Sequence, residues 1–278
     1  MRWPAIIAAV LRNLVAWALV LALALPLFWM ALTSLKPESE LFAMPISVLP
    51  EEWTLEAYRL LLGETAFLTY FRNSVIVASA TTVLVIVVSA LGAYSLVRFN
   101  YRGREWIAGL ALVSYLLPSV VLIVPIYLMM VAVGLANTLA SLVIAYTSFA
   151  LPYALWLLRS FMASVPEDLE SAAMIDGASR MEAFVDVVLP QALPGIISTA
   201  LFTFILAWNE YLFALVLVNA DAQRPLTTGV MTMLVSGFNV EWSLLMAASV
   251  MMSVPLILVL AFLQSYLVGG FGAGAVKG

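Results

Sequence analysis

The chain has 278 residues, of which 64% are hydrophobic and only 10% are charged, and its mean hydropathy is +1.08. Soluble domains carry about 25% charged residues, so this composition excludes a soluble globular protein and indicates an integral membrane protein. The net charge of −4 argues against a nucleic-acid partner, and the lack of cysteine and histidine excludes thiolate or imidazole metal sites and the catalysis that uses these side chains.

The spacing of charged residues predicts where the chain crosses the membrane. Three long intervals carry no charge: Arg12 to Lys36, Arg72 to Arg98 and Glu105 to Arg159. A crossing helix needs roughly 20 apolar residues, so the last interval holds two, with a turn at 134–138 between them. We expect an all-α integral membrane protein with one transmembrane domain, over 1–278, of six helices at about 13–34, 73–97, 106–131, 138–159, 192–218 and 243–268.

The first apolar stretch follows Arg2 and Arg12, which is also the order of a signal peptide. It is longer than the apolar part of a usual signal peptide, and polar sequence begins only at Thr33, so we expect an uncleaved first crossing. The segment 36–70 is acidic and is expected outside the cytoplasm, with one short helix near residues 55–62.

Basic residues predict the orientation in the membrane. The short loop from Arg98 to Arg104 (RFNYRGR) contains three arginines, and such loops lie on the cytoplasmic side. Both termini, including Lys277, are then expected in the cytoplasm, as is the region 164–194. That region is acidic, but acidic residues count little in this rule.

A polar, acidic segment interrupts the apolar sequence from Ser164 to Pro194 (SVPEDLESAAMIDGASRMEAFVDVVLPQALP). Its pattern predicts two short helices joined at Gly177, which fits a left-handed turn. Ser164–Glu167 and Ser179–Glu182 each have the spacing of a capping box. Pro190 is expected to end the second helix.

The two helices of this acidic segment have different faces. The second carries an apolar stripe at helical spacing: Met181, Phe184, Val185, Val188 and Leu189. The first carries the small residues Ser171, Ala172 and Ala173, which allow a neighbouring backbone to come close. Two interpretations are open from the residues alone: a docking site for a cytoplasmic partner, or a loop helix lying on the lipid headgroups.

The run LESAAMIDGAS, followed by Phe184, Pro190 and Pro194, resembles the EAA signature of ABC-importer permeases. In that signature EAA is followed after two residues by DGA, and then by a phenylalanine and two prolines. Further matches extend over nearly the whole chain and together resemble carbohydrate-importer permeases of the type of the maltose transporter's G subunit. They are Asn73–Ser74, Gly92–Tyr94, Arg98–Phe99, Arg102–Gly103, Pro125–Tyr127, Trp208–Glu210 and Gly274–Gly278.

This resemblance implies the type I ABC importer permease fold, in the plasma (inner) membrane of a prokaryote. In that family two permeases form a heterodimer around one path, two cytoplasmic ATPase subunits each grip a coupling helix, and an extracytoplasmic binding protein delivers the sugar. ATP and Mg²⁺ would belong to the ATPase subunits, because this chain has no GxxxxGK loop; it would itself bind no cofactor and catalyse no reaction. The residues implied to couple to the ATPase are Glu170, Ser171, Ala172, Ala173, Met174, Asp176, Gly177 and Ala178.

One position departs from the family pattern. When the sequence is aligned on Asp176–Ala178, the position of the family's glutamate holds Ser171, and Glu170 stands one place earlier. A residue one place earlier lies about 100° round a helix, so Glu170 is an imperfect substitute for a glutamate that contacts the ATPase.

Glu210 is the only charge well within a predicted crossing, and such residues usually face the bundle interior or a wet cavity. Either Asn209 and Glu210 lie on the substrate path, or they form hydrogen bonds that hold the bundle together. Tyr146 and Trp208 are candidates for stacking on a sugar ring, although most aromatic residues of membrane helices pack or lie at the interface.

Two other classes of function compete with the permease subunit. A self-sufficient secondary transporter or channel would use intramembrane ion-coupling residues and often inverted repeats, and one glutamate is thin support for it. An intramembrane enzyme would need a catalytic group, and the sequence offers no histidine, cysteine or paired intramembrane carboxylates.

Overall fold

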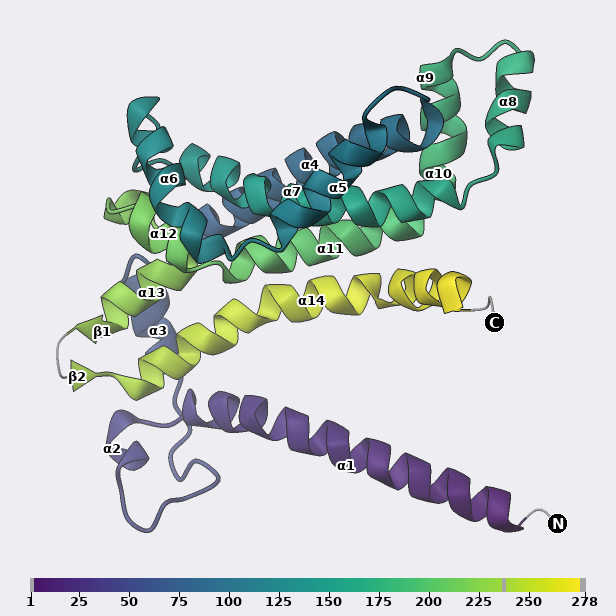
Figure 1. Ribbon diagram of the computed structural model, residues 1–278. Helices are drawn as coiled ribbons and strands as arrows, with labels where there is room; N and C mark the ends of the chain where they lie inside the picture. Colours follow the sequence, from purple (N-terminus) through teal and green to yellow (C-terminus); the bar gives the residue numbers. More distant parts are fainter. Residues whose placement is uncertain (1–2, 237–238, 276–278) are drawn as a thin grey trace. The chain divides into compact units, whose positions relative to one another are not determined.

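The computed structural model describes residues 3–236 and 239–275, so Arg2 and Lys277, used above for the orientation, lie outside the described residues. The described chain is nearly all helical, as predicted (Figure 1). The first part holds α1 (Trp3–Thr33), α2 (Glu38–Leu41), α3 (Glu56–Gly63) and α4 (Phe67–Arg98). The middle holds α5 (Arg104–Tyr115), α6 (Ser119–Ala132), α7 (Leu139–Ala163), α8 (Glu167–Ile175), α9 (Arg180–Ala183), the π-helical turn η1 (Phe184–Val188) and α10 (Leu189–Gln191).

The last part of the chain begins with α11 (Leu193–Asn209) and α12 (Leu212–Leu217), followed by the 3₁₀ turn η2 (Asp221–Gln223) and α13 (Leu226–Leu234). Strands β1 (Val235–Ser236) and β2 (Asn239–Val240) pair antiparallel, Val235 with Val240 and Ser236 with Asn239, and α14 (Trp242–Ala275) ends the described chain. The contacts divide the chain into two compact units, residues 1–68 with 230–255 and residues 69–229 with 256–278. The boundary between them falls inside α4, α13 and α14.

Among the described residues, four helical segments are long and apolar enough to cross a membrane: Val10–Thr33, Phe67–Arg98, Leu139–Ala163 and Trp242–Leu263. Two further pairs of helices meet the criterion together but are sharply bent, α5 with α6 by 102° and the run Arg180–Gln191 with α11 by 76°. Counting each bent pair as one crossing gives up to six among the described residues. The chain is therefore a multi-pass membrane protein.

Two of the predicted crossings are not the continuous helices that the sequence suggested. The helix expected over 106–131 is broken between Tyr115 and Ser119, because Pro118 lacks an N–H and disfavours helical geometry in the residue before it. The helix expected over 192–218 ends at Asn209, and a new helix begins at Leu212.

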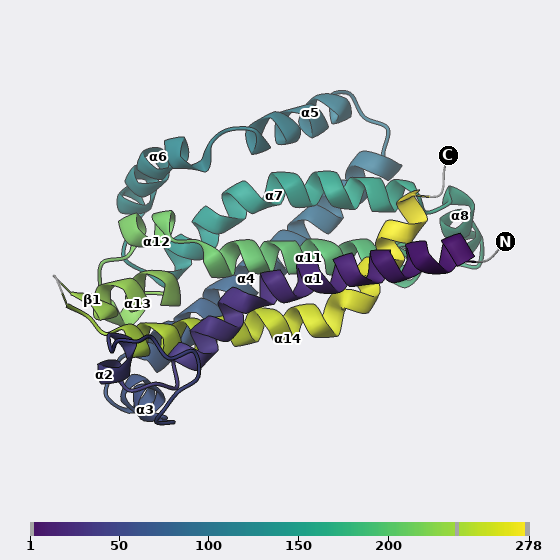
Figure 2. The same ribbon diagram turned by 90° about the horizontal axis from the view of Figure 1, so that it is seen from below.

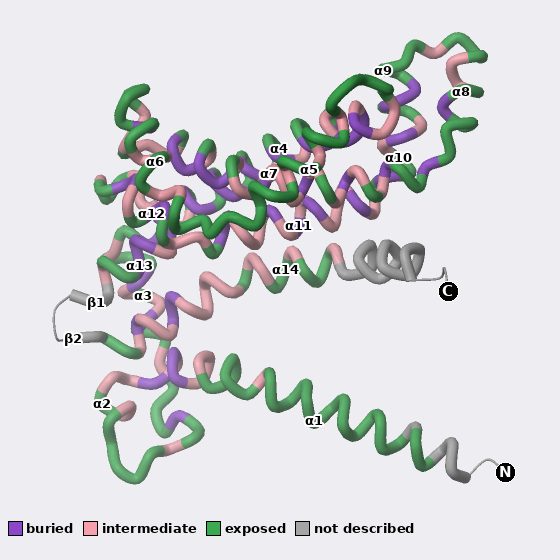
Figure 3. Tube along the Cα trace, viewed as in Figure 1, coloured by how far each residue is buried: buried purple, intermediate pink, exposed green. Residues whose placement is uncertain are grey.

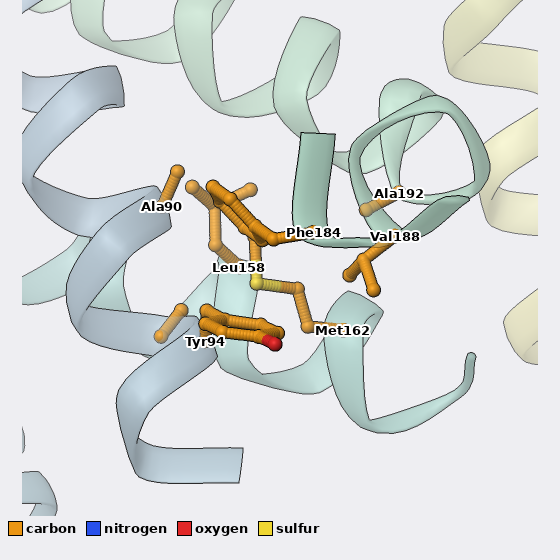
Figure 4. Packing of buried hydrophobic residues seen from close by; sticks show 8 residues of the cluster. Ala90, Tyr94, Leu158, Met162, Phe184, Val188 and Ala192 are labelled. Carbon is orange, nitrogen blue, oxygen red and sulfur yellow. The ribbon is translucent and has the colours of Figure 1, made fainter. Parts of the chain in front are cut away.

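In the second unit, α7 and α11 run side by side (Figures 1 and 2). The core lies where α4 meets α7 and the start of α11. Figure 4 shows a cluster of buried side chains gathered between these helices: Ala90, Ala93, Tyr94, Leu158, Met162, Phe184, Val188 and Ala192. Phe184 and Val188 come from η1, so the second arm of the acidic segment is packed into the core of the second unit. The Asn73 amide donates to the carbonyl oxygens of Ala222 and Arg224, 2.9 Å from each, and ties the loop after α12 to α4.

The first unit is organised around a loop held by charged side chains. Lys36, only 4% exposed, donates to the carbonyl and hydroxyl oxygens of Ser47 at 2.6 and 2.9 Å and pairs with Glu40 at 3.2 Å. Glu38 accepts the backbone N–H groups of Trp242 and Ser243 at 3.1 and 2.9 Å, so the loop is fixed to the start of α14. The predicted helix near residues 55–62 is confirmed as α3. Figure 3 shows α1 almost entirely exposed within the chain.

Candidate functional site

The acidic segment forms two helical arms joined at a glycine (Figure 1). Gly177 has a φ of 101°, so the predicted left-handed turn is confirmed. Ser179 and Glu182 form the predicted capping box: the carboxylate accepts the Ser179 N–H at 2.7 Å and the hydroxyl accepts the Glu182 N–H at 3.3 Å.

The first predicted capping box is wrong. Ser164 ends α7, and its hydroxyl donates to the Phe161 carbonyl at 2.7 Å. Helix α8 begins after Pro166, with no side chain capping its first turn. A serine hydroxyl between two helices can either donate to a carbonyl of the preceding helix or accept an N–H of the following one. Here Ser164 donates to the preceding helix, so it does not cap α8.

The prediction that Pro190 ends the second arm is also wrong, because the helix continues to Gln191. The preceding turn, η1, is π-helical, and its wider i to i+5 spacing accommodates a ring that would clash with a carbonyl in an α-helix. The predicted apolar stripe is only partly buried. Phe184 and Val188 are buried, whereas Met181 and Val185 are 58% and 47% exposed.

Helix α8 presents a distinct outer face. Ser171, Ala172, Ile175, Asp176 and Gly177 are exposed, and Ala173, Met174 and Ala178 are half-buried. Ile175 is the most protruding, with 86% of its surface exposed. At about 100° per residue, Ala172 and Ile175 lie roughly 200° and 140° from Glu170, on the opposite side of the helix. A face of small residues around one large apolar side chain is suited to entering a groove.

Glu170 has different surroundings from the other residues predicted to couple to an ATPase. It is only 2% exposed, and its Oε2 lies 2.7 Å from Nε of Arg98 at the end of α4. The Tyr94 hydroxyl donates to its other oxygen, Oε1. Arg98 also donates to the Val165 carbonyl at 2.8 Å and lies 3.6 Å from Glu167.

Sequence reasoning missed this contact, because its partners are 72 residues apart and Arg98 was assigned to a loop by charge alone. A second contact lies beside it. The guanidinium of Arg180 stands 5.1 Å from the centre of the Phe99 ring, within the range of a cation–π interaction. The Tyr94 ring packs against both Phe99 and Phe184, at 5.9 and 4.5 Å between ring centres. The end of α4 thus contacts both arms of the acidic segment.

The predicted intramembrane polar site lies at the break between α11 and α12. The Glu210 carboxylate accepts the backbone N–H groups of Phe213 and Ala214 at 2.9 and 3.2 Å, and so satisfies the otherwise free donors that begin α12. The Glu210 carbonyl accepts the Thr227 hydroxyl at 2.7 Å. The Asn209 amide donates to the Ile205 carbonyl of its own helix at 2.8 Å. A place for these residues on a substrate path stays a prediction.

The two aromatic candidates are buried. Tyr146 is 1% exposed, its ring lies 5.8 Å from that of Phe149, and it interacts electrostatically with Glu210, so the structure brings these two predicted residues together. Trp208 instead packs on Phe204 and Phe71, at 5.7 and 5.8 Å. Within residues 3–236 and 239–275, no group of three or more acidic side chains is placed to hold a metal ion.

Comparison with known proteins identifies the family of the chain. Residues 86–271 match the family model of the binding-protein-dependent transport system inner membrane component. The diacetylchitobiose uptake system permease protein DasC of Streptomyces coelicolor is 34% identical over 267 residues, 96% of each chain. The trehalose/maltose transport system permease protein MalG of Thermococcus litoralis is 34% identical over 255 residues, 91% of each chain.

A solved structure shares the fold. A chain of a bacterial ABC transporter involved in the import of the acidic polysaccharide alginate superposes with a TM-score of 0.82, at 22% identity, over 94% of this chain and 96% of that one. The resemblance carried by the EAA signature is thereby confirmed. The chain belongs to the binding-protein-dependent transport system inner membrane component family, the permeases of ABC importers.

Proposed function

We propose that this chain is one of two permease subunits of an ATP-driven carbohydrate importer, with α8 as its coupling helix. In this proposal the chain is one domain that crosses the membrane six times, with α5–α6 and α11–α12 each forming one broken crossing, and with both termini and the acidic segment in the cytoplasm. A second permease completes the path, two ATPase subunits bind ATP and Mg²⁺, and an extracytoplasmic binding protein delivers the sugar.

The names of the relatives support the substrate class. Besides the diacetylchitobiose and trehalose/maltose permeases, the sulfoquinovosyl glycerol transport system permease protein SmoH of Agrobacterium fabrum is 36% identical over 269 residues. The substrates that these three names give all contain a sugar unit. A further alginate transporter structure contains an oligosaccharide-bound periplasmic protein, and its fold matches this chain with a TM-score of 0.67. We therefore propose a sugar or an oligosaccharide as the transported molecule.

The single observation that carries the coupling role is the two-sided character of α8. Glu170 fixes its inner side to α4, while the outer side, with Ala172 and Ile175, remains free within the chain. A helix whose outer face carries small side chains around one exposed apolar residue is suited to a partner groove in the water phase, and the ATPase subunits of such importers are the proposed partners. Ser171, at the position of the family glutamate, lies at the edge of that face.

The test uses single cysteines, because the chain has none of its own. Ser171→Cys and Ala172→Cys should crosslink to the ATPase in the intact complex, whereas the control Asn100→Cys, on the exposed α4–α5 loop, should do so far less. The chain alone should hydrolyse no ATP, and the complex should. If the chain purifies without an ATPase and alone drives uptake with protons or sodium ions, it is a secondary transporter and the proposal is wrong.

A further inference from the structure

The contact between α4 and α8 is made by three side chains, Tyr94, Arg98 and Glu170, and is called here the α4–α8 contact. Both oxygens of Glu170 are used: Oε1 accepts the Tyr94 hydroxyl and Oε2 accepts Nε of Arg98 at 2.7 Å. The side chains of Arg98 and Glu170 are 6% and 3% exposed. Tyr94 and Arg98 stand one helical turn apart and therefore share one face of α4. Glu170 thus accepts hydrogen bonds from two successive turns of α4.

The α4–α8 contact joins two helices that are far apart along the chain. Helix α8 follows α7 directly in the chain, and through α9, η1 and α10 it leads to α11. Helix α4 is not adjacent to α8 along the chain, since 68 residues separate Arg98 from Glu167. A movement of α8 therefore reaches α7 and α11 along the backbone, but it reaches α4 only through side-chain contacts.

The α4–α8 contact resists separation more than an exposed ion pair does. Pulling Glu170 away would leave a buried guanidinium and a buried carboxylate without partners, which is far more costly than parting two solvated charges. Arg98 is further fixed by its bond to the Val165 carbonyl at 2.8 Å, at the start of the acidic segment. The neighbouring Phe99 receives Arg180 from the second arm. The end of α4 and the acidic segment are thus built to move as one body.

We propose that the α4–α8 contact transmits the displacement of the coupling helix to α4, and that Glu170 is a positioning residue inside the permease rather than a contact of the ATPase. This inference rests on the proposed function of α8. It also accounts for the departure of the sequence from the family pattern, because Glu170 serves the internal contact and leaves Ser171 at the outer position.

The experiment measures substrate transported per ATP hydrolysed in the reconstituted complex, for Glu170→Gln, Arg98→Met and Tyr94→Phe. We expect assembly and ATP hydrolysis to persist in Glu170→Gln and Arg98→Met. The ratio of substrate transported to ATP hydrolysed should fall about tenfold, which is within the usual range of coupling between sites. Tyr94→Phe, which removes one oxygen, should lower the ratio less. The exchanged pair Arg98→Glu with Glu170→Arg should recover part of the ratio.

The matched control is the ion pair of Arg159 with Glu105, which joins α7 to α5 at 2.8 Å. Its side chains are 31% and 64% exposed, so it is far less buried than the α4–α8 contact. Arg159→Met and Glu105→Gln should leave the ratio unchanged. If Arg98→Met does not assemble, Glu170→Gln and Tyr94→Phe decide the question, since both keep the shape of the side chain.

Two results would overturn the inference. One is a normal ratio in Glu170→Gln and Tyr94→Phe. The other is loss of the Ser171→Cys crosslink to the ATPase in the Glu170→Gln background, which would make Glu170 part of the docking surface. A wild-type complex that shows neither this crosslink nor ATP-driven uptake would instead refute the proposed function itself, so the two failures are distinguishable.

Discussion

The ring of Phe161 fills the space beside Gly195, so that a Cβ added at Gly195 would lie 2.2 Å from the nearest ring carbon. Helices α7 and α11 therefore meet where only a hydrogen fits. We expect Gly195→Ala to destabilise the protein by about 1–3 kcal/mol, the usual cost of overpacking a core. Thermal unfolding in detergent measures this, and Phe161→Ala in the same chain should relieve part of the cost.

The control for that experiment is Gly109→Ala on α5, where no heavy atom lies within 4 Å of an added Cβ. Alanine has the higher helix propensity, so this variant should be neutral or slightly stabilising. Equal losses at Gly109 and Gly195 would mean that the contact with Phe161 does not exist as described.

Gly177 allows a test of backbone conformation alone, because its φ is 101° but no atom lies within 4 Å of an added Cβ. We expect a graded loss of transport in the order Asn, Ala, Val, since Asn tolerates positive φ best, a Cβ there costs roughly 1–2 kcal/mol, and a β-branched side chain is worst. The unfolding temperature of the membrane helices should change little. Uptake assays would contradict this if Gly177→Val transported normally, or if Gly63→Ala, without a left-handed φ, did equal harm.

Glu210 uses both carboxylate oxygens to accept N–H groups of α12. Glu210→Gln keeps one acceptor and turns the other into a donor, so one hydrogen bond is lost, at about 1 kcal/mol. We expect a lower unfolding temperature with assembly retained, and a larger decrease for Glu210→Leu. If Glu210→Gln unfolds like the wild type but transports poorly, the carboxylate belongs to the substrate path rather than to the helix start.

The loop of the first unit should respond to acid through Glu40. Hydrogen bonds from Ser47, from the backbone of Glu51 and Glu52, and from Lys36 lower the pKa of Glu40 from 4.5 to about 2. Because the folded pKa lies below the ordinary one, the stabilisation is present above pH 4.5 and is lost as the pH falls toward 2. Protection of the Glu51 and Glu52 amides from hydrogen exchange should decrease in that window.

In Glu40→Gln the protection of these amides should be low and nearly independent of pH across the same window. Glu64→Gln, at an exposed position just after α3, should behave like the wild type. A pH response that survives Glu40→Gln would assign it to another group.

The orientation in the membrane can be read from cysteine labelling. Cysteines at Glu51 and Asp221 should react with an impermeant reagent in intact cells, and cysteines at Arg102 and Lys277 only after permeabilisation. This follows from the arginine-rich loop between α4 and α5. The reverse pattern would place the acidic segment outside and remove the basis for an ATPase contact.

Local chemistry made much of this fold predictable. The apolar intervals mark the long helices, Gly177 marks a turn that only glycine adopts easily, and the Ser179–Glu182 spacing marks a helix start. The breaks at Pro118 and Glu210 were harder to place, because apolar sequence continues on both sides and composition alone cannot distinguish a broken crossing from a straight one.

The candidate site was predictable in position but not in its internal contacts. The EAA-like run located α8, yet the bond of Glu170 to Arg98 depends on tertiary packing that no local pattern encodes. The exposure of Met181 and the burial of Phe184 likewise depend on tertiary packing, and the π-helical turn has no sequence signature of its own.

That π-helical turn has a consequence for how the acidic segment is aimed. A π turn amounts to one residue more than an α-helix would use, and one residue corresponds to about 100° of rotation about the helix axis. Residues before Phe184, including Gly177 and all of α8, are therefore rotated by about that angle relative to α10. The direction in which α8 points therefore depends on the number of residues in this turn, and not only on the side chains on its surface.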